Sequence, residues 1–171
     1  MDDEKEFPER KPTRLKGFDY SSPGAYFITI CTKDRKQLFA PVGADSISAQ
    51  MIKNTFSETI NQYEGVDSPI YVVMPNHFHA IITIREHTGC SPTLSEIVQT
   101  FKRHSTTNYI KMVQDGILKP FKKQIWQRSF HDHIIRDKND YEMIYRYIYE
   151  NPMHWQYDCF YCEDDNEADV D

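Results

Sequence analysis

A long apolar stretch, residues 70–84, is interrupted near its middle by Pro75 and Asn76. The stretch is rich in β-branched and aromatic residues, which favour strands, and Pro75 has no N–H group to donate within a sheet. It therefore predicts two strands, one on each side of the interruption. Residues 25–32 have the same character and predict an earlier strand, and a short strand is expected at residues 131–135.

Three further segments predict helices. Apolar side chains recur at helical spacing in residues 46–63 and 94–112, and a third helix is expected at residues 140–149. Asp137 or Asn139 is placed to cap the third helix. The order strand, helix, two strands, helix, strand and helix is typical of an α+β fold. We therefore expect an antiparallel sheet of ferredoxin or RNA-recognition type, packed with helices.

The chain of 171 residues is long enough for one folded domain. Residues 1–16 predict a charged N-terminal arm, residues 17–157 the folded domain, and residues 158–171 an acidic disordered tail. The N-terminus lacks the apolar segment of a secretory signal, and no apolar run approaches the roughly 20 residues that cross a bilayer. The four cysteines do not form a disulfide framework. These features predict a cytoplasmic protein without a membrane partner.

The net charge of −6 argues at first against a nucleic-acid partner, but the charges are unevenly distributed. Residues 158–171 contain seven acidic residues and no Lys or Arg, so the rest of the chain carries a charge of +1. Residues 98–138 contain nine basic residues and three acidic ones. A basic body with an acidic tail is compatible with a phosphate-backbone partner, and a solvated charged face is the alternative interpretation.

His77 and His79 flank Phe78 in one of the predicted strands. Because side chains alternate along a strand, both imidazoles point to one face of the sheet and Phe78 points to the other. Two imidazoles in this arrangement can chelate one divalent metal ion. Two half-buried histidines that only form hydrogen bonds are the alternative interpretation.

In the third predicted helix, Tyr147 and Asn151 are four residues apart and share a face. A phenol can attack phosphorus, but its ordinary pKa of about 10 means that it needs assistance. A divalent metal ion can polarise the scissile phosphate, and the Asn151 carbonyl could supply a third protein ligand. Packing is the alternative explanation for tyrosines on a helix.

Residues 125–133 combine aromatic side chains with Arg128, His131 and His133. Bases can stack on such aromatic rings while an arginine binds phosphate. The two histidines form a second pair around Asp132. This pair is a candidate for a metal or catalytic role, and hydrogen bonding within the fold is the alternative.

Several blocks of residues occur in a characteristic order. They are residues 19–20 with 24–29, then residues 73–79, and then residues 126–128, 133–136 and 147–152. Together they resemble the REP-associated tyrosine transposases, a branch of the single-tyrosine HUH transposases with an IS200-like domain. The resemblance covers about residues 14–156, and the order and spacing of the blocks are more specific than any one of them.

The resemblance implies that His77 and His79 bind Mg²⁺ or Mn²⁺, that Tyr147 is the nucleophile, and that Asn151 is the third metal ligand. Such a tyrosine cleaves DNA to a 5′-phosphotyrosine and a free 3′-OH, and the covalent link allows rejoining without ATP. Because imidazole is softer than Mg²⁺ prefers, Mn²⁺ is expected to support activity better. The implied partner is single-stranded DNA with hairpins of the repetitive extragenic palindrome type. A monomer and a homodimer both remain open.

Basic and aromatic side chains are the candidates for contacts with this DNA. They are Lys102, Arg103, Lys122, Lys123, Trp126, Arg128 and Arg136. Three other functions remain open: a DNA-hairpin-binding protein with little or no cleavage, a phosphodiesterase that uses water as its nucleophile, and a structural protein. The first of these would contain the same residues, so only an activity assay separates it from a transposase, whereas the phosphodiesterase would keep its activity in Tyr147→Phe.

Overall fold

The computed structural model describes residue 15 and residues 17–39, 46–86 and 91–161. The expected N-terminal arm lies almost wholly outside these residues. Of the expected acidic tail, only residues 158–161 are described.

Four antiparallel strands form one sheet. They are β1 (Gly24–Cys31), β2 (Val66–Met74), β3 (His77–Ile84) and β4 (His131–Ile135), and their order in the sheet is β2-β3-β1-β4. This order, with a helix between β1 and β2 and another between β3 and β4, is the expected ferredoxin-type arrangement. The predicted α+β class is therefore confirmed.

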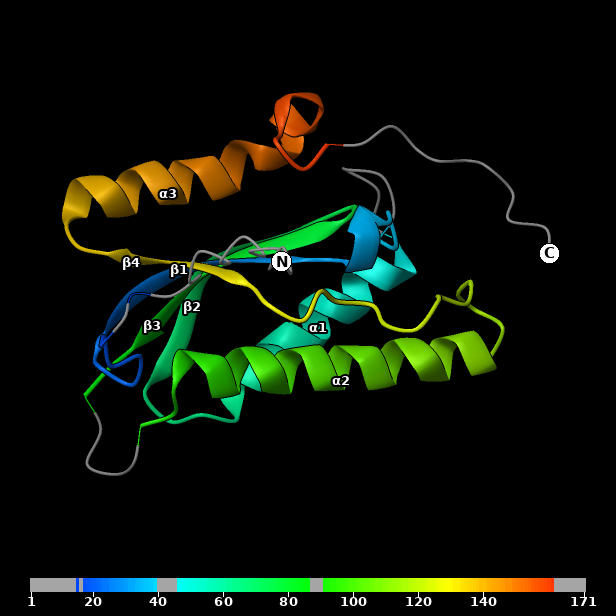
Figure 1. The fold of residues 1–171 in the computed structure, drawn as a ribbon, viewed down its shortest axis with the longest axis horizontal. Helices are drawn as coiled ribbons and strands as arrows, with labels where there is room; N and C mark the ends of the chain where they lie inside the picture. The colour runs from blue at the N-terminus through cyan, green and yellow to red at the C-terminus, as the bar shows by residue number, and fades with distance from the viewer. Residues whose placement is uncertain (1–14, 16, 40–45, 87–90, 162–171) are drawn as a thin grey trace, which may run out of the picture.

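Three helices cover the two faces of this sheet (Figure 1). Helices α1 (Ile47–Asn61) and α2 (Leu94–Gln114) lie on one face, and α3 (Lys138–Glu150) lies over the other. Short 3-10 segments follow β1 and α3, at η1 (Lys33–Arg35) and η2 (Asn151–Tyr157). No helix among the described residues combines the length and the apolar character that a membrane span requires.

The hydrophobic core lies between the sheet and helices α1 and α2. Phe78 of β3 packs there between Phe56 of α1 and Phe101 of α2, with ring centroids 4.7 and 5.0 Å away. Alternate residues of β1 point into the same core, including the fully buried Tyr26 and Ile28. Because strand side chains alternate, the neighbouring residues of β1 and β3 face α3 instead.

The strands and helices lie within two residues of their predicted bounds, except at the beginning of β2. Strand β2 begins four residues early, and its register against β3 shifts between Asp67 and Ile70, where Pro69 cannot donate to the ladder. Helix α3 begins at Lys138, because the Asp137 side chain accepts a hydrogen bond of 2.9 Å from the N–H of Asp140. Of the two predicted caps, Asp137 is the one that the structure uses.

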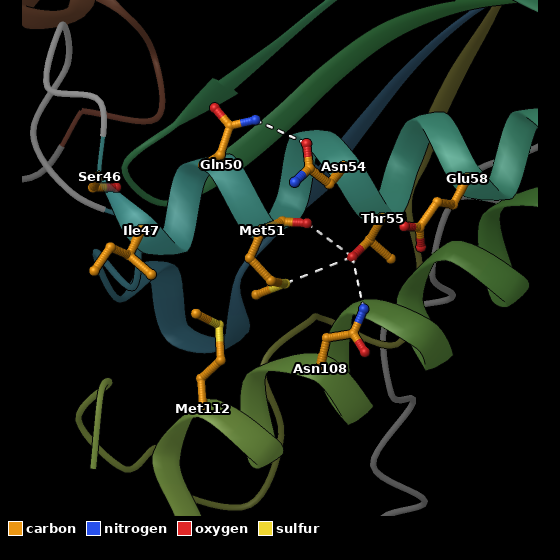
Figure 2. A pocket seen from close by; sticks show the side chains of 9 residues that line it. All are labelled: Ser46, Ile47, Gln50, Met51, Asn54, Thr55, Glu58, Asn108 and Met112. Carbon is orange, nitrogen blue, oxygen red and sulfur yellow. Dashed lines mark hydrogen bonds between the residues drawn. The ribbon is translucent and has the colours of Figure 1, made fainter. Parts of the chain in front are cut away.

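A groove lies between α1 and α2, on the side of the sheet away from α3 (Figure 2). Asn108 of α2 donates to the Thr55 hydroxyl of α1 across 2.9 Å, and Thr55 in turn donates to the carbonyl of Met51 across 2.8 Å. The first of these hydrogen bonds joins the two helices, and the second lies within α1. The predicted histidine pair and Tyr147 lie on the other side of the sheet.

Candidate active site

The register of β3 against β1 positions the two histidines. His77 lies opposite Cys31 and His79 lies opposite Thr29, so both imidazoles project from the face covered by α3. Their ring centroids are 4.5 Å apart, and the two residues are 0% and 1% exposed. The expected pair on one face is therefore present, and it is buried.

The Nδ1 atom of each imidazole has a hydrogen-bond partner. His77 Nδ1 lies 2.8 Å from Asn76 Oδ1, and because that oxygen can only accept, the proton must be on Nδ1. His79 Nδ1 lies 2.9 Å from the Thr29 hydroxyl. These partners leave Nε2 of both rings directed into the site, which is how histidine ligands of metal ions are usually oriented.

Helix α3 brings Tyr147 to the histidines. The Tyr147 hydroxyl lies 3.3 Å from His79 Nε2, and its ring packs edge-on against Phe27 of β1 at 6.0 Å. The next residue, Ile148, is the buried residue of α3 and anchors the helix on the sheet. Tyr147 itself is 41% exposed, so its hydroxyl reaches the histidines from the solvent side.

A carboxylate from the C-terminal end of the chain completes the cluster. Asp158 Oδ2 accepts hydrogen bonds from the Tyr147 hydroxyl at 3.3 Å and from the Asn151 amide at 2.8 Å, and lies 3.9 Å from His77 Nε2. The potential ligand atoms of His77, His79 and Asp158 lie within 4.8 Å of one another. Among the described residues, this is the arrangement of histidine and acidic side chains that could hold a metal ion.

Two polar atoms at this point fit a bound cation. His77 Nε2 and Asn151 Oδ1 are buried and have no hydrogen-bond partner among the described residues. Burying polar atoms without partners is unfavourable, and both atoms carry lone pairs that a metal ion would accept. Two imidazoles, one carboxylate and one amide oxygen form a donor set suited to a divalent ion such as Mn²⁺.

The electrostatics keep both histidines neutral and the tyrosine protonated. Burial lowers the pKa of His77 and of His79; Asp158 opposes this effect at His77, and the charge of Arg35 adds to it. Burial and then the negative charge of Asp158 raise the pKa of the Tyr147 phenol above its ordinary value. The imidazoles are therefore ready to act as ligands, whereas ionising the phenol requires an added positive charge.

Residues 158–161, which we call the C-terminal segment, cover the histidines. The Phe160 ring packs on His77 with centroids 4.8 Å apart, and the Phe160 carbonyl accepts a 2.8 Å hydrogen bond from the Asn76 amide. The Phe160 N–H donates to Asp158 Oδ1 across 2.7 Å, which fixes the turn that presents the carboxylate. The first four residues of the expected tail thus have a defined place at the site.

A family model described as "Transposase IS200 like" matches residues 21–151. The chain belongs to this family. It is 32% identical to an uncharacterized protein of Haemophilus influenzae, over 90% of this chain and 94% of that protein. It is 27% identical to the REP-associated tyrosine transposase of Escherichia coli, over 78% of this chain and 69% of that protein.

A solved structure supports the fold of this IS200-like chain. It is that of a REP-associated tyrosine transposase bound to a REP hairpin, and it superposes with a TM-score of 0.60 at 23% identity. The match covers 87% of this chain and 76% of the other. The resemblance to this group of transposases is therefore confirmed at the level of family and fold.

Two of the candidate DNA contacts are engaged within the IS200-like domain itself. Lys102 donates to the carbonyls of Gln127 and Ser129, at 2.9 and 3.0 Å. Trp126 is only 5% exposed, and its indole N–H donates to the buried Ser105 hydroxyl across 2.9 Å. In the described structure Trp126 is a core residue, so its ring is not offered to a base. The remaining candidates are exposed: Arg103, Lys122, Lys123, Arg128 and Arg136.

The second histidine pair lies outside the cluster of His77, His79 and Asp158. His131 and His133 project from the edge strand β4 and are exposed. His133 pairs with Asp140 at the start of α3, with Nε2 and Oδ2 2.8 Å apart. This contact ties α3 to β4, so His133 has a structural role in this IS200-like domain, as the alternative interpretation proposed.

The sequence did not indicate Asp158, Thr29 or Asn76 as parts of the site. Asp158 was grouped with the acidic tail because it is the first of seven acidic residues there. The chemistry of the predicted pair does indicate a further ligand. Imidazoles alone are poor ligands for a hard cation, so a carboxylate is expected near them. Thr29 is found only once the register of β1 against β3 is known.

Proposed function

We propose that this chain is a metal-dependent single-stranded DNA endonuclease and transposase that cleaves and rejoins DNA beside hairpins through a 5′-phosphotyrosine at Tyr147. The observation that carries the proposal is the 3.3 Å approach of the Tyr147 hydroxyl to His79 Nε2, next to the cluster of His77, His79 and Asp158. A nucleophile beside a metal-type site is the arrangement that attack on a phosphodiester requires.

Each side chain has a role that follows from its position. His77, His79 and Asn151 hold the metal ion, with Asp158 as a further oxygen donor beside them. When bound, the ion polarises the scissile phosphate and neutralises the charge that develops on it. Asn76 and Thr29 fix the orientation of the two imidazoles.

The proposed transfer of the phosphoryl group to Tyr147 needs no co-reactant. The Tyr147 oxygen forms a bond to phosphorus while the bond from phosphorus to the 3′ oxygen breaks. The phenol loses one proton and the departing 3′ oxygen gains one, so the net proton count is unchanged. Reversing the step with a different 3′-OH rejoins the strand, because the phosphotyrosine retains the phosphodiester bond energy.

The proposed substrate class follows from the family and from the exposed cations. The related transposase that superposes on this chain is bound to a REP hairpin, so we propose hairpin-bearing single-stranded DNA as the partner here. Arg103, Lys122, Lys123, Arg128 and Arg136 are the proposed backbone contacts. Strong salt dependence of binding is expected if they neutralise phosphates.

The decisive experiment incubates the protein with labelled hairpin DNA that has single-stranded flanks, in Mn²⁺, and separates the products on a denaturing gel. The wild type is compared with Tyr147→Phe and with Tyr149→Phe as a matched control. Tyr149 lies on the same helix and is 69% exposed. We expect a metal-dependent covalent protein–DNA band that is lost only in Tyr147→Phe.

Two other outcomes would contradict the proposal in different ways. Cleavage without a covalent band, and unaffected by Tyr147→Phe, would indicate hydrolysis by water. Tight binding without cleavage by any variant would indicate a hairpin-binding protein.

The burial of both histidines beneath the C-terminal segment favours a hairpin-binding protein with little cleavage as the second candidate function, because DNA reaches them only after the segment moves.

A further inference from the structure

The turn after β1 has an unusual backbone. Asp34 and Arg35 both adopt a φ of 56°, in the left-handed region that non-glycine residues rarely occupy. The surrounding hydrogen bonds hold the turn in place: Thr32 N–H donates to the carbonyl of Asn76 across 2.8 Å, and Lys33 N–H donates to that of Ile125 across 2.7 Å. Strained residues of this kind cluster at functional sites. Arg35 is one of the two strained residues in this turn.

The position of this turn relative to the site follows from the sheet. Cys31, the last residue of β1, lies opposite His77, so the turn lies at the end of the sheet where the histidines begin. The Arg35 guanidinium carbon is 5.4 Å from the centre of the Phe160 ring, and that ring packs on His77 at 4.8 Å. Arg35 Nη1 donates to the Cys159 carbonyl across 3.4 Å.

The positive charge of Arg35 lies beside the site, because its guanidinium stacks on the Phe160 ring that packs on His77. At the site, the two imidazoles are neutral and the Asp158 carboxylate is negative. A phosphodiester adds one negative charge, and more negative charge develops on it during displacement. A guanidinium at this position supplies a second positive charge beside a metal ion.

The geometry points to Arg35 as a residue that binds a non-bridging oxygen of the scissile phosphate and stabilises the charge that develops there. This inference rests on the proposed function. The contacts of Arg35 include the face of the Phe160 ring and a 3.4 Å hydrogen bond to the Cys159 carbonyl. Charge-assisted hydrogen bonds to phosphate are stronger than either contact, and the planar guanidinium can form two of them in parallel. When DNA displaces Phe160, the Arg35 side chain therefore leaves the Phe160 ring and becomes available to the phosphate.

A purely structural role makes a different prediction. If Arg35 served only to hold Cys159 and Phe160 over the histidines, its removal would loosen the C-terminal segment and speed cleavage. If it stabilises the transition state, its removal slows cleavage even though the segment is looser. The sign of the change therefore separates the two roles.

The test compares wild type with Arg35→Ala, Arg35→Lys and the matched control Lys36→Ala, which removes an exposed cation from the same turn. Single-turnover cleavage of hairpin DNA is measured at saturating DNA in Mn²⁺. DNA affinity is measured by fluorescence anisotropy in a non-cleaving buffer without metal, and Mn²⁺ affinity by calorimetry. Thermal melts confirm that each variant is folded.

We expect Arg35→Ala to cleave about 10²- to 10³-fold more slowly than wild type, the range found when one transition-state donor is removed. DNA affinity should fall less than about tenfold and Mn²⁺ affinity should be unchanged. Arg35→Lys should recover part of the rate, because it restores charge without the planar fork, and Lys36→Ala should match wild type.

The inference is overturned if wild type is active and Arg35→Ala cleaves equally fast or faster, or if its slower cleavage is explained by lost Mn²⁺ binding. Wild type that binds hairpin DNA but does not cleave it overturns the proposed function, and this inference with it. The activity of wild type therefore shows which of the two has failed.

Discussion

The chemistry of the site depends on which nitrogen of each imidazole faces it. Asn76 Oδ1 forces the proton of His77 onto Nδ1, and Thr29 holds Nδ1 of His79. Both Nε2 atoms are thereby directed toward Tyr147 and Asp158. The orientation of the two imidazoles is set by two uncharged side chains, Thr29 and Asn76.

Replacing Thr29 with Val removes one of these orienting contacts while keeping a β-branched side chain in the strand. We expect Mn²⁺ affinity to fall about ten- to hundredfold, as is typical when an outer partner of a histidine ligand is lost. Titration calorimetry measures this directly. Thr83→Val, on the same face of the sheet but at the far end of β3, is the control and should bind Mn²⁺ like wild type. Equal affinities in both variants would contradict the orienting role.

The stability of the metal-free protein should depend on pH through the buried histidines. Their pKa values are lowered in the folded state, so the unfolded chain binds protons that the folded chain does not. The free energy of unfolding is therefore highest above about pH 6.5 and falls as pH is lowered from there toward the folded pKa values. The slope is at most about 1.4 kcal/mol per pH unit for each histidine.

Urea denaturation in EDTA at pH 5.0 to 7.5 checks this expectation. The double variant His77→Gln, His79→Gln should show a shallower dependence than wild type, whatever its absolute stability. Identical slopes would mean that these histidines are protonated equally in the folded and unfolded chains.

Part of the site could be predicted from local spacing alone. The alternation of a strand places His77 and His79 on one face, and a four-residue separation places Tyr147 and Asn151 on one face of a helix. Asp158 could not be found in this way. Its position depends on the path of η2, which ends at Tyr157, six residues beyond Asn151, with no periodic pattern to indicate its direction.

Among the three helices, α3 buries the fewest side chains, and it carries the proposed nucleophile. Only Ile148 of this helix is buried, whereas α1 and α2 each bury seven or more side chains. Its start is held by the Asp137 cap and by the pair of His133 with Asp140. Near its end, the Tyr147 ring packs against Phe27 and the Tyr147 hydroxyl lies 3.3 Å from His79 Nε2. The position of Tyr147 thus depends on contacts near both ends of the helix.

Asp137→Ala removes the cap of α3 and should lower stability by about 1 kcal/mol. Because α3 has little buried surface to compensate, amide hydrogen exchange should quicken selectively in residues 138–150. Mass spectrometry of peptic fragments measures this. The matched control is Thr93→Ala, which removes the capping box of α2; its effect should be confined to the start of α2. Unchanged exchange in α3 would show that the cap does not hold it.

The elements themselves were largely predictable, and the reasons differ. All four strands and three helices occur in the predicted order, because turn residues such as Pro75 and Gly65 separate segments with clear periodicity. The early start of β2, at Val66 rather than at residue 70, was not predicted, and it brings Pro69 into the strand. In the structure the irregular register between Asp67 and Ile70 accommodates that proline.

In the whole molecule, residues 158–161 return to cover the end of the sheet where β3 begins. The Phe160 ring lies on His77, and its main chain is bonded to Asn76 and Asp158. Access to the histidines therefore requires the C-terminal segment to lift. A local opening of this kind is governed by the few contacts that the segment makes.

Phe160→Ala removes the main apolar contact of this segment. The reaction of His77 and His79 with diethyl pyrocarbonate should become roughly tenfold faster, since losing about 1.4 kcal/mol of apolar burial changes an opening equilibrium by that factor. Mass spectrometry of the peptide containing both histidines measures the rate. Tyr157→Ala, at a side chain that is 86% exposed, is the control and should react like wild type. Equal rates in all three proteins would mean that the segment does not limit access.

The connection between β4 and α3 consists of two residues, Arg136 and Asp137. It is too short to carry α3 away to another molecule without unfolding its start, and Tyr147 already lies 3.3 Å from His79 of the same chain. In this structure Tyr147 and His79 of one chain lie together. Under the proposed function, a chain that acts alone offers the one nucleophile Tyr147 to two strand ends, so it would not hold both ends covalently at once. Its first covalent link would have to pass to a 3′-OH before a second could form, and a rapid burst of product would stop at one equivalent per chain.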